Sequence, residues 1–206
     1  MADRDTAGPQ VLVLGWLTDV SGAITAALGR HDITVKHTHP PGSHKPDRKR
    51  WRTTASAAPP LSAAEIDSIE SVIAIFDGHA VRSRFGGRQN CASRRRLRVS
   101  ANDACDSTTA AALTVGARRV LLICDARRLP GRRRALAASW TRDLAHRIGY
   151  ECSVNGLPDN ASYAVIESDA EVTEIADVVV GWHDSDGPGW PAVTSASSAP
   201  RPSRPS

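Results

Sequence analysis

The feature that most constrains the fold is a series of short, wholly apolar runs separated by helix-forming segments. One of them, Val120 to Cys124, reads Val-Leu-Leu-Ile-Cys, with no polar residue in alternate positions. Such runs are typical of strands that are buried on both faces of a parallel sheet. Strands are predicted at 11–14, 33–36, 72–76, 119–124, 150–154 and 178–180, and helices at 20–28, 62–70, 107–113, 132–148 and 170–176. This alternation predicts an α/β fold with parallel sheets.

The order of these elements predicts two domains and a tail. Residues 1–104 and 105–190 each follow a strand–helix–strand–helix–strand scheme, which indicates two pseudo-symmetric lobes. The polar segment between His37 and Pro60 is predicted to be a long loop. The last residues, 191–206, are rich in proline, serine and alanine, so we expect a disordered tail.

Composition excludes several classes of protein. The chain has 206 residues, 41% hydrophobic and 23% charged, with no apolar run near the roughly 20 residues that span a bilayer. The first ten residues lack the layout of a signal peptide. We therefore predict a cytoplasmic protein without a membrane partner. The four cysteines are scattered, with no spacing typical of a disulfide framework or a metal site.

The charge is basic, +4 at pH 7, and arginines cluster at 94–98 and 132–134. Such clusters are also found on nucleic-acid-binding faces. Two observations favour an ordinary solvated surface instead. The chain contains 22 acidic residues, and only 4% of its residues are aromatic, which leaves few side chains to stack on bases. A nucleic-acid partner is therefore not expected.

Polar residues follow one predicted strand in each lobe. Asp77 and His79 come after 72–76, and His183 and Asp184 come after 178–180. Because ligands bind at the carboxyl ends of parallel strands, two such ends predict a cleft with an acid on each wall. The simpler interpretation is that both aspartates cap turns or helices. The two histidine–aspartate pairs would also suit a divalent metal, but no recognised ligand spacing is present, so no metal is predicted.

Three phrases carry a resemblance to a known family. They are STTAAALTVGARRVLLIC at 107–124, GLPDN at 156–160 and ADVVV at 176–180. In order and spacing they resemble the aspartate/glutamate racemase superfamily, and most closely its maleate cis-trans isomerase and arylmalonate decarboxylase branch. The resemblance implies two α/β lobes, no cofactor and one catalytic cysteine at a strand end of each lobe. These cysteine positions fall at Asp77 and Asp184, so both cysteines are absent.

The resemblance predicts a cofactor-independent, isomerase- or racemase-like protein that acts on a small carboxylic acid. Asp77 and Asp184 would exchange protons with the substrate in an interlobe cleft, because paired acids split their pKa values. Substrate contacts are predicted for Asp19, His79, Asn160 and His183. Two acids would repel a dicarboxylate unless Arg82, Arg84 or another cation neutralised the site.

Two alternatives stay open. One is a divergent member of the fold that binds a ligand or partner without catalysis, which the loss of both cysteines favours. The other is a metal-dependent enzyme that uses the histidine–aspartate pairs. A homodimer is left open as the assembly.

Overall fold

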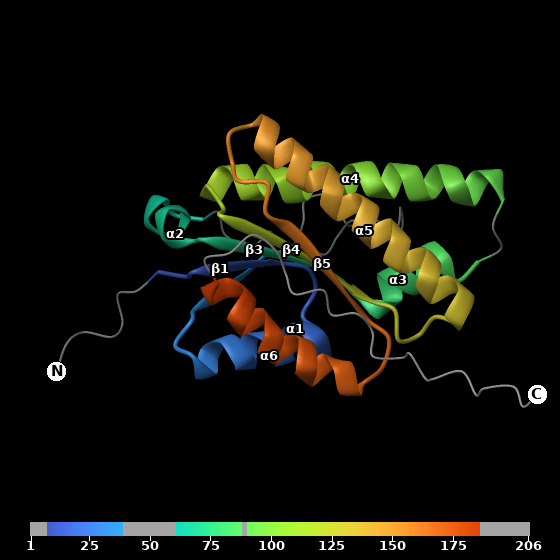
Figure 1. The fold of residues 1–206 in the computed structure, drawn as a ribbon, viewed down its shortest axis with the longest axis horizontal. Coiled ribbons are helices and arrows are strands. Elements are labelled where there is room, and N and C mark those ends of the chain that lie inside the picture. The colour runs from blue at the N-terminus through green and yellow to red at the C-terminus, as the bar shows by residue number, and fades with distance from the viewer. Residues whose placement is uncertain (1–7, 39–60, 88–89, 186–206) are drawn as a thin grey trace, which may run out of the picture.

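The computed structural model describes residues 8–38, 61–87 and 90–185, which form a five-stranded parallel sheet with helices on both faces (Figure 1). The predicted α/β class with parallel strands is confirmed. The strands are β1 (Val11–Leu14), β2 (Val35–Thr38), β3 (Ser71–Phe76), β4 (Arg119–Asp125) and β5 (Ala161–Ile166). The helices are α1 (Asp19–Arg30), α2 (Ala63–Ser68), α3 (Gly78–Phe85), α4 (Cys91–Val115), α5 (Gly131–Val154) and α6 (Ala170–Asp184).

The strand order is β2-β1-β3-β4-β5. The chain moves from β1 outward to β2, and then returns to the other side of β1 to add β3, β4 and β5. This reversal makes a topological switch point between β1 and β3. In doubly wound folds of this order, the crevice outside the carboxyl ends of the strands at the switch point is where ligands bind.

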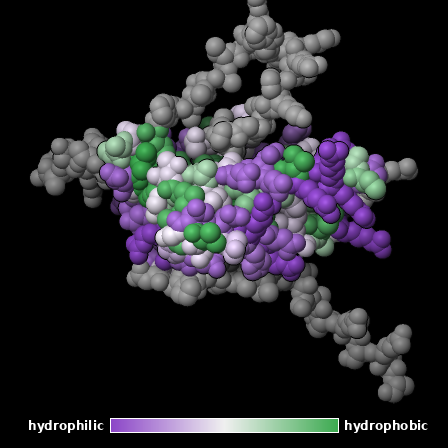
Figure 2. All heavy atoms as spheres, turned by 90° about the horizontal axis from the view of Figure 1, so that it is seen from above, coloured by the Kyte–Doolittle hydropathy of each residue, from purple (hydrophilic) through white to green (hydrophobic). Residues whose placement is uncertain are grey.

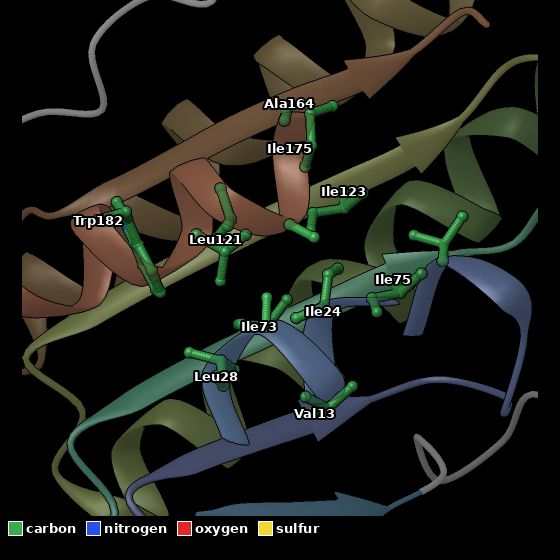
Figure 3. Packing of buried hydrophobic residues seen from close by; sticks show 14 of the residues in the cluster. Val13, Ile24, Leu28, Ile73, Ile75, Leu121, Ile123, Ala164, Ile175 and Trp182 are labelled. Carbon is green, nitrogen blue, oxygen red and sulfur yellow. The ribbon is translucent and has the colours of Figure 1, made fainter. Parts of the chain in front are cut away.

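One face of the sheet is covered by α1 and α6, which pack against each other below the strands (Figure 1). Apolar residues of α1 and α6 pack against Val13, Ile73, Leu121 and Ile123 on this face of the sheet (Figure 3). Every second residue of these strands points to this face, and those between point to the other. The strands therefore bury both faces, as their unbroken apolar sequence predicts.

The opposite face is covered by α4 and α5, with α2 at one end and α3 at the other (Figure 1). Leu12, Val72 and Leu122 pack here against Leu144 and Ile148 of α5 and against residues of α4. Near the carboxyl ends of the strands, α3 packs against the first half of α5 and against Leu97 of α4. Three helices therefore meet at one corner of the molecule.

The division into two lobes is not visible in this architecture. β3 pairs with β4 over six residues, from Ser71–Arg119 to Phe76–Cys124, so strands from both predicted lobes share one sheet. The predicted boundary at residue 104 lies within α4. The long predicted loop falls mostly outside the described residues, and so does the predicted tail, 191–206.

Two predicted strands are wrong. Residues 150–154 complete α5, and residues 178–180 lie within α6. The helix predicted at 107–113 is longer than expected, because α4 begins at Cys91. A capping box of Ser62 and Glu65 begins α2. In the described part of the chain, no helix combines the length and apolar character needed to cross a membrane.

Candidate functional site

A cavity of about 260 Å³ opens at the switch point, between the ends of β1 and β3 and the helices α3 and α4. Its floor is formed by the ends of the two strands and the start of the β1–α1 loop. Its walls come from α3 and from the middle of α4. The residues that line it with polar or charged groups are Trp16, Asp77, Arg84, Ser100, Asp103, Ser107 and Thr108.

Glycine allows the β1–α1 loop to leave the sheet beside β3. The backbone of Gly15 has a φ angle of 151°, in a region that residues with a Cβ atom rarely adopt. A Cβ atom at this position would lie 2.9 Å from the Ile75 carbonyl oxygen. The close approach brings the loop against the end of β3 and closes one side of the cavity.

Asp77 lies at the end of β3 and is the N-cap of α3. Its Oδ1 accepts hydrogen bonds from the backbone N–H groups of His79, at 2.8 Å, and Ala80, at 2.9 Å. The capping interpretation of this residue is therefore confirmed, although Asp77 also lines the cavity. His79 is exposed in the first turn of α3 and is not among the residues that line the cavity.

Arg84 is the cation of the cavity. It is half-buried, and its guanidinium lies against two aromatic side chains, with Cζ 5.2 Å from the ring centroid of Phe76 and 5.4 Å from that of Trp140. The two rings meet edge to face, 5.2 Å apart. Burial lowers the pKa of Arg84, while electrostatic effects of Cys124, Asp77 and Asp103 oppose the shift. The aromatic contacts hold the guanidinium in place by cation–π attraction.

The Nη1 atom of Arg84 is buried and has no hydrogen-bond partner among the described residues. Buried guanidinium groups are normally paired, because an unsatisfied charged donor costs several kcal/mol, roughly, in desolvation. The indole N–H of Trp140 also lacks a described partner, but Trp140 does not line the cavity. Arg84 is therefore the donor that an anionic group in the cavity would satisfy.

A second arginine at the same edge of the sheet is fully paired. Arg127 donates to both carboxylate oxygens of Asp125, at 2.9 Å each, and its guanidinium also lies 2.8 Å from Asp19 and 2.6 Å from Asp169. The hydrogen bond from Arg127 is the main cause of the lowered pKa of Asp19. Arg127 therefore links Asp19, at the start of α1, to the segments that follow β4 and β5, and Asp19 is not among the residues that line the switch-point cavity.

The remaining predicted site residues lie at the other edge of the sheet, where the strands begin. His183 shares a hydrogen bond of 2.9 Å with Ser71, the first residue of β3, and burial lowers its pKa. Asp184 and His183 line a polar cavity with Ser71 and Arg119. Asn160 precedes β5 and donates to the Arg118 carbonyl oxygen at 3.4 Å.

The two catalytic candidates are therefore far apart. Asp77 follows the last residue of β3, whereas His183 and Asp184 lie beside its first residue, and six residues of extended chain span about 20 Å. Asp77 and Asp184 line different cavities, so the described residues do not bring them together in one cleft. The same separation prevents Asp77, His79, His183 and Asp184 from sharing a metal ion. No group of three or more potential ligand side chains is placed to bind a metal in the part of the chain that the structure describes.

Comparison with protein-family models, curated proteins and solved structures finds no match. The resemblance to the racemase superfamily stays a prediction. The site must therefore be interpreted from its own geometry.

Sequence reasoning placed Asp77 at the carboxyl edge but missed most of the cavity around it. Ser100, Asp103 and Thr108 face the site from α4, in a region where the sequence predicted only a short helix that begins near Ser107. Arg84 was considered only as a neutralising charge. One signal in the sequence was available, because Arg84 lies next to Phe85 and eight residues after Phe76. An arginine among aromatic residues in a helix after a buried strand is a candidate for a buried cation.

Proposed function

We propose that the protein binds a small organic carboxylate in the switch-point cavity, with Arg84 as the residue that binds the carboxylate group. The observation that carries the proposal is Arg84 itself, which lines the cavity and whose buried Nη1 has no described hydrogen-bond partner. A guanidinium presents a planar fork that pairs with a carboxylate through two parallel hydrogen bonds. The aromatic contacts with Phe76 and Trp140 would orient this fork before the ligand arrives.

The other charges of the cavity favour a carboxylate that also carries a hydrogen-bond donor. Asp77 and Asp103 line the same space and both act electrostatically on Arg84. A phosphate dianion would be repelled by these two carboxylates. A singly charged acid with a hydroxyl or ammonium group could place its negative end on Arg84 and its donor near an aspartate. The volume, about 260 Å³, suits a small molecule.

The proposal adopts the alternative in which the chain binds a ligand without two-acid isomerisation. Among the described residues, those that line the cavity include no histidine and no cysteine. One of its two carboxylates, Asp77, already accepts two backbone hydrogen bonds. The site therefore has the groups that recognition requires, and Asp184, the predicted partner of Asp77, lies in a different cavity.

The test is a binding screen with matched variants. The full chain is titrated with small 2-hydroxy, 2-amino and unsubstituted carboxylic acids by isothermal calorimetry, with inorganic phosphate as a comparison. Arg84→Met removes the charge but keeps a long side chain against the two rings. Arg82→Met is the control, because Arg82 is exposed on the same helix and does not line the cavity.

We expect a substituted carboxylic acid to bind wild type and the Arg82 variant equally, and to bind the Arg84 variant roughly 10- to 100-fold more weakly. We also expect the free Arg84→Met protein to be at least as stable as wild type to urea, because removal of an unpaired charge relieves its desolvation cost. A free variant less stable by about 1–3 kcal/mol would indicate a structural role for Arg84. Equal affinities in both variants, or no binding by any acid in the panel, would also overturn the proposal.

A further inference from the structure

Two stretches of the sequence contain arginine but no acidic residue. Residues 78–102 and 126–142 together hold 13 of the 23 arginines of the chain and none of its 22 acidic residues. The acids are therefore not mixed evenly among the basic residues, although the overall charge is only +4. The two stretches contain α3, the first half of α4 and the first half of α5.

The fold brings these stretches to one corner of the molecule. α4 and α5 both begin at the right-hand end in Figure 1, where α3 lies beneath them. Leu97 of α4, Ala137 of α5 and Phe85 of α3 pack in one apolar cluster, so the three segments are in contact. In Figure 2, which looks down on α4 and α5, long hydrophilic side chains project from this same end.

Most of these arginines face solvent without a partner. Eight of them are exposed, and one of these, Arg142, is paired with Asp143. We call the other seven the basic corner, and none of them forms an ion pair with another described residue. The basic corner consists of Arg82, Arg94, Arg95, Arg96, Arg98, Arg128 and Arg132. By contrast, Arg30 pairs with Asp177 at 2.9 Å, and Arg118 lies 3.8 Å from Glu70.

The arrangement is unfavourable for the free protein. Like charges repel, and arginines in the first turns of α4 and α5 lie at the positive ends of the helix dipoles. Neither helix has an acidic residue in its first turn. A polyanion that covered the basic corner would remove both penalties.

We propose that the basic corner binds the phosphate backbone of double-stranded nucleic acid, without sequence specificity. Arginine pairs with phosphate through two hydrogen bonds, and backbone phosphates supply most of the affinity in nonspecific binding. A duplex is favoured over a single strand because single-strand binding depends on aromatic side chains that stack on bases. The two acid-free stretches contain only two aromatic residues, Phe85 and Trp140, and both belong to the packed interior.

The experiment measures fluorescence anisotropy of a labelled, random-sequence DNA duplex of about 20 base pairs with the full chain. One variant carries Arg94→Gln, Arg95→Gln and Arg98→Gln. The matched control carries Arg30→Gln, Arg118→Gln and Arg147→Gln, which removes the same charge from exposed positions outside the basic corner. Each protein is titrated at several salt concentrations between about 50 and 200 mM.

We expect the basic-corner variant to lose at least tenfold in affinity at the lowest salt concentration. The slope of log K against log salt concentration should become shallower by about 3. The control should stay within about twofold of wild type. Equal losses in the two variants would mean that only net charge matters and would overturn the proposal, as would absence of binding by wild type. If the unlabelled single strand or polyglutamate bound more tightly than the duplex, the proposal of a duplex partner would be wrong, and the tighter ligand would indicate the class of partner.

This surface is separate from the carboxylate cavity, and the two proposals fail independently. Arg84→Met should bind the duplex as wild type does, since Arg84 is not part of the basic corner. The triple variant should keep its affinity for a carboxylate found in the screen.

Discussion

Arg84 and Arg127 both lie near the carboxyl edge of the sheet, and the difference between them lies in the charges that face them. Arg127 is paired with three carboxylates, and these hydrogen bonds raise its pKa, the one from Asp125 above all. Arg84 has two aromatic rings and a buried, unpaired nitrogen. Asp125 is only 4% exposed, so its pair with Arg127 is a structural link among loops. The unpaired arginine is the one left available for a ligand.

A pH dependence of stability is expected from His183. Burial lowers the pKa of this histidine from its ordinary value of 6.5, and the effects of Asp184 and Glu70 oppose that shift without cancelling it. The unfolded chain therefore binds a proton at a higher pH than the folded chain does. Stability from this group is complete above about pH 6.5 and is lost as the pH falls toward the folded pKa. Urea unfolding between about pH 8 and pH 5 measures this loss.

The variant His183→Gln should flatten this part of the pH profile, because glutamine can still approach Ser71 but does not titrate. His146→Gln is a suitable control, since His146 is exposed on α5. If the two variants kept the same pH dependence as wild type, the burial of His183 would have no effect on folding.

At the scale of elements, α5 provides a matched pair of leucines. Leu144 is 3% exposed and packs in the core between α5 and the sheet, whereas Leu136 is 37% exposed. Leu144→Ala should lower the free energy of unfolding by about 2–5 kcal/mol, because it leaves a cavity in the core. Leu136→Ala should change it by no more than about 0.5 kcal/mol. Similar costs for both, measured by urea denaturation, would mean that α5 packs on a different face.

The sequence predicts the strands of this fold more accurately than the helices of its C-terminal part, α5 and α6. Four of the five strands are expected near their observed positions, because β1, β3 and β4 are unbroken apolar runs. Val178 to Val180 also forms such a run, but it lies in α6, where Ile175, Ala176, Val179, Val180 and Trp182 are buried at helical spacing. A run of three β-branched residues cannot by itself distinguish a buried strand from the buried face of a helix.

Glycine caused a second error, at the end of α5. The helix predicted at 132–148 stops before Gly149, yet α5 continues to Val154. A Cβ at Gly149 would lie 3.4 Å from Cβ of Ala161 at the start of β5, and closer still to the Asp159 carboxylate. The glycine therefore permits close packing and does not end the helix. This error hid β5, because 150–154 had taken its place.

The assignment of 178–180 as a strand explains why Asp184 was predicted at the wrong edge of the sheet. A residue that follows a strand lies at the carboxyl edge, but Asp184 ends a helix that runs back to the opposite edge. Asp77 is positioned correctly because β3 is a true strand. The contribution of α4 to the cavity depends on tertiary packing, which local sequence patterns do not encode.

At the scale of the whole molecule, one sheet joins the segments that the sequence divided. The ladder between β3 and β4 runs through the centre of the sheet, so neither 1–104 nor 105–190 has a complete core alone. We expect the full chain to unfold in urea in a single transition, with fluorescence and far-UV circular dichroism giving the same midpoint. The two segments, expressed separately, should each lack cooperative unfolding.

Two resolved transitions in the full chain, or a cooperatively folded fragment 105–190, would instead support two independent lobes. The Leu144→Ala variant adds a check within the full chain. It should move the entire transition, including the part reported by residues of the first segment.

The strand pairing has a consequence for how fast the protein reaches its native state. The nearest partners in the sheet, Val11 and Val35, are 24 residues apart, and Val11 and Ser71 are 60 apart. Every ladder among the described strands therefore joins distant parts of the chain. Loop closure must be completed before these contacts contribute, which slows folding and exposes apolar strands during it. The described strands form no hairpin that could fold early, so the first structure of the nascent chain should be helical, and its strands would depend on protection from aggregation until β3 and β4 meet.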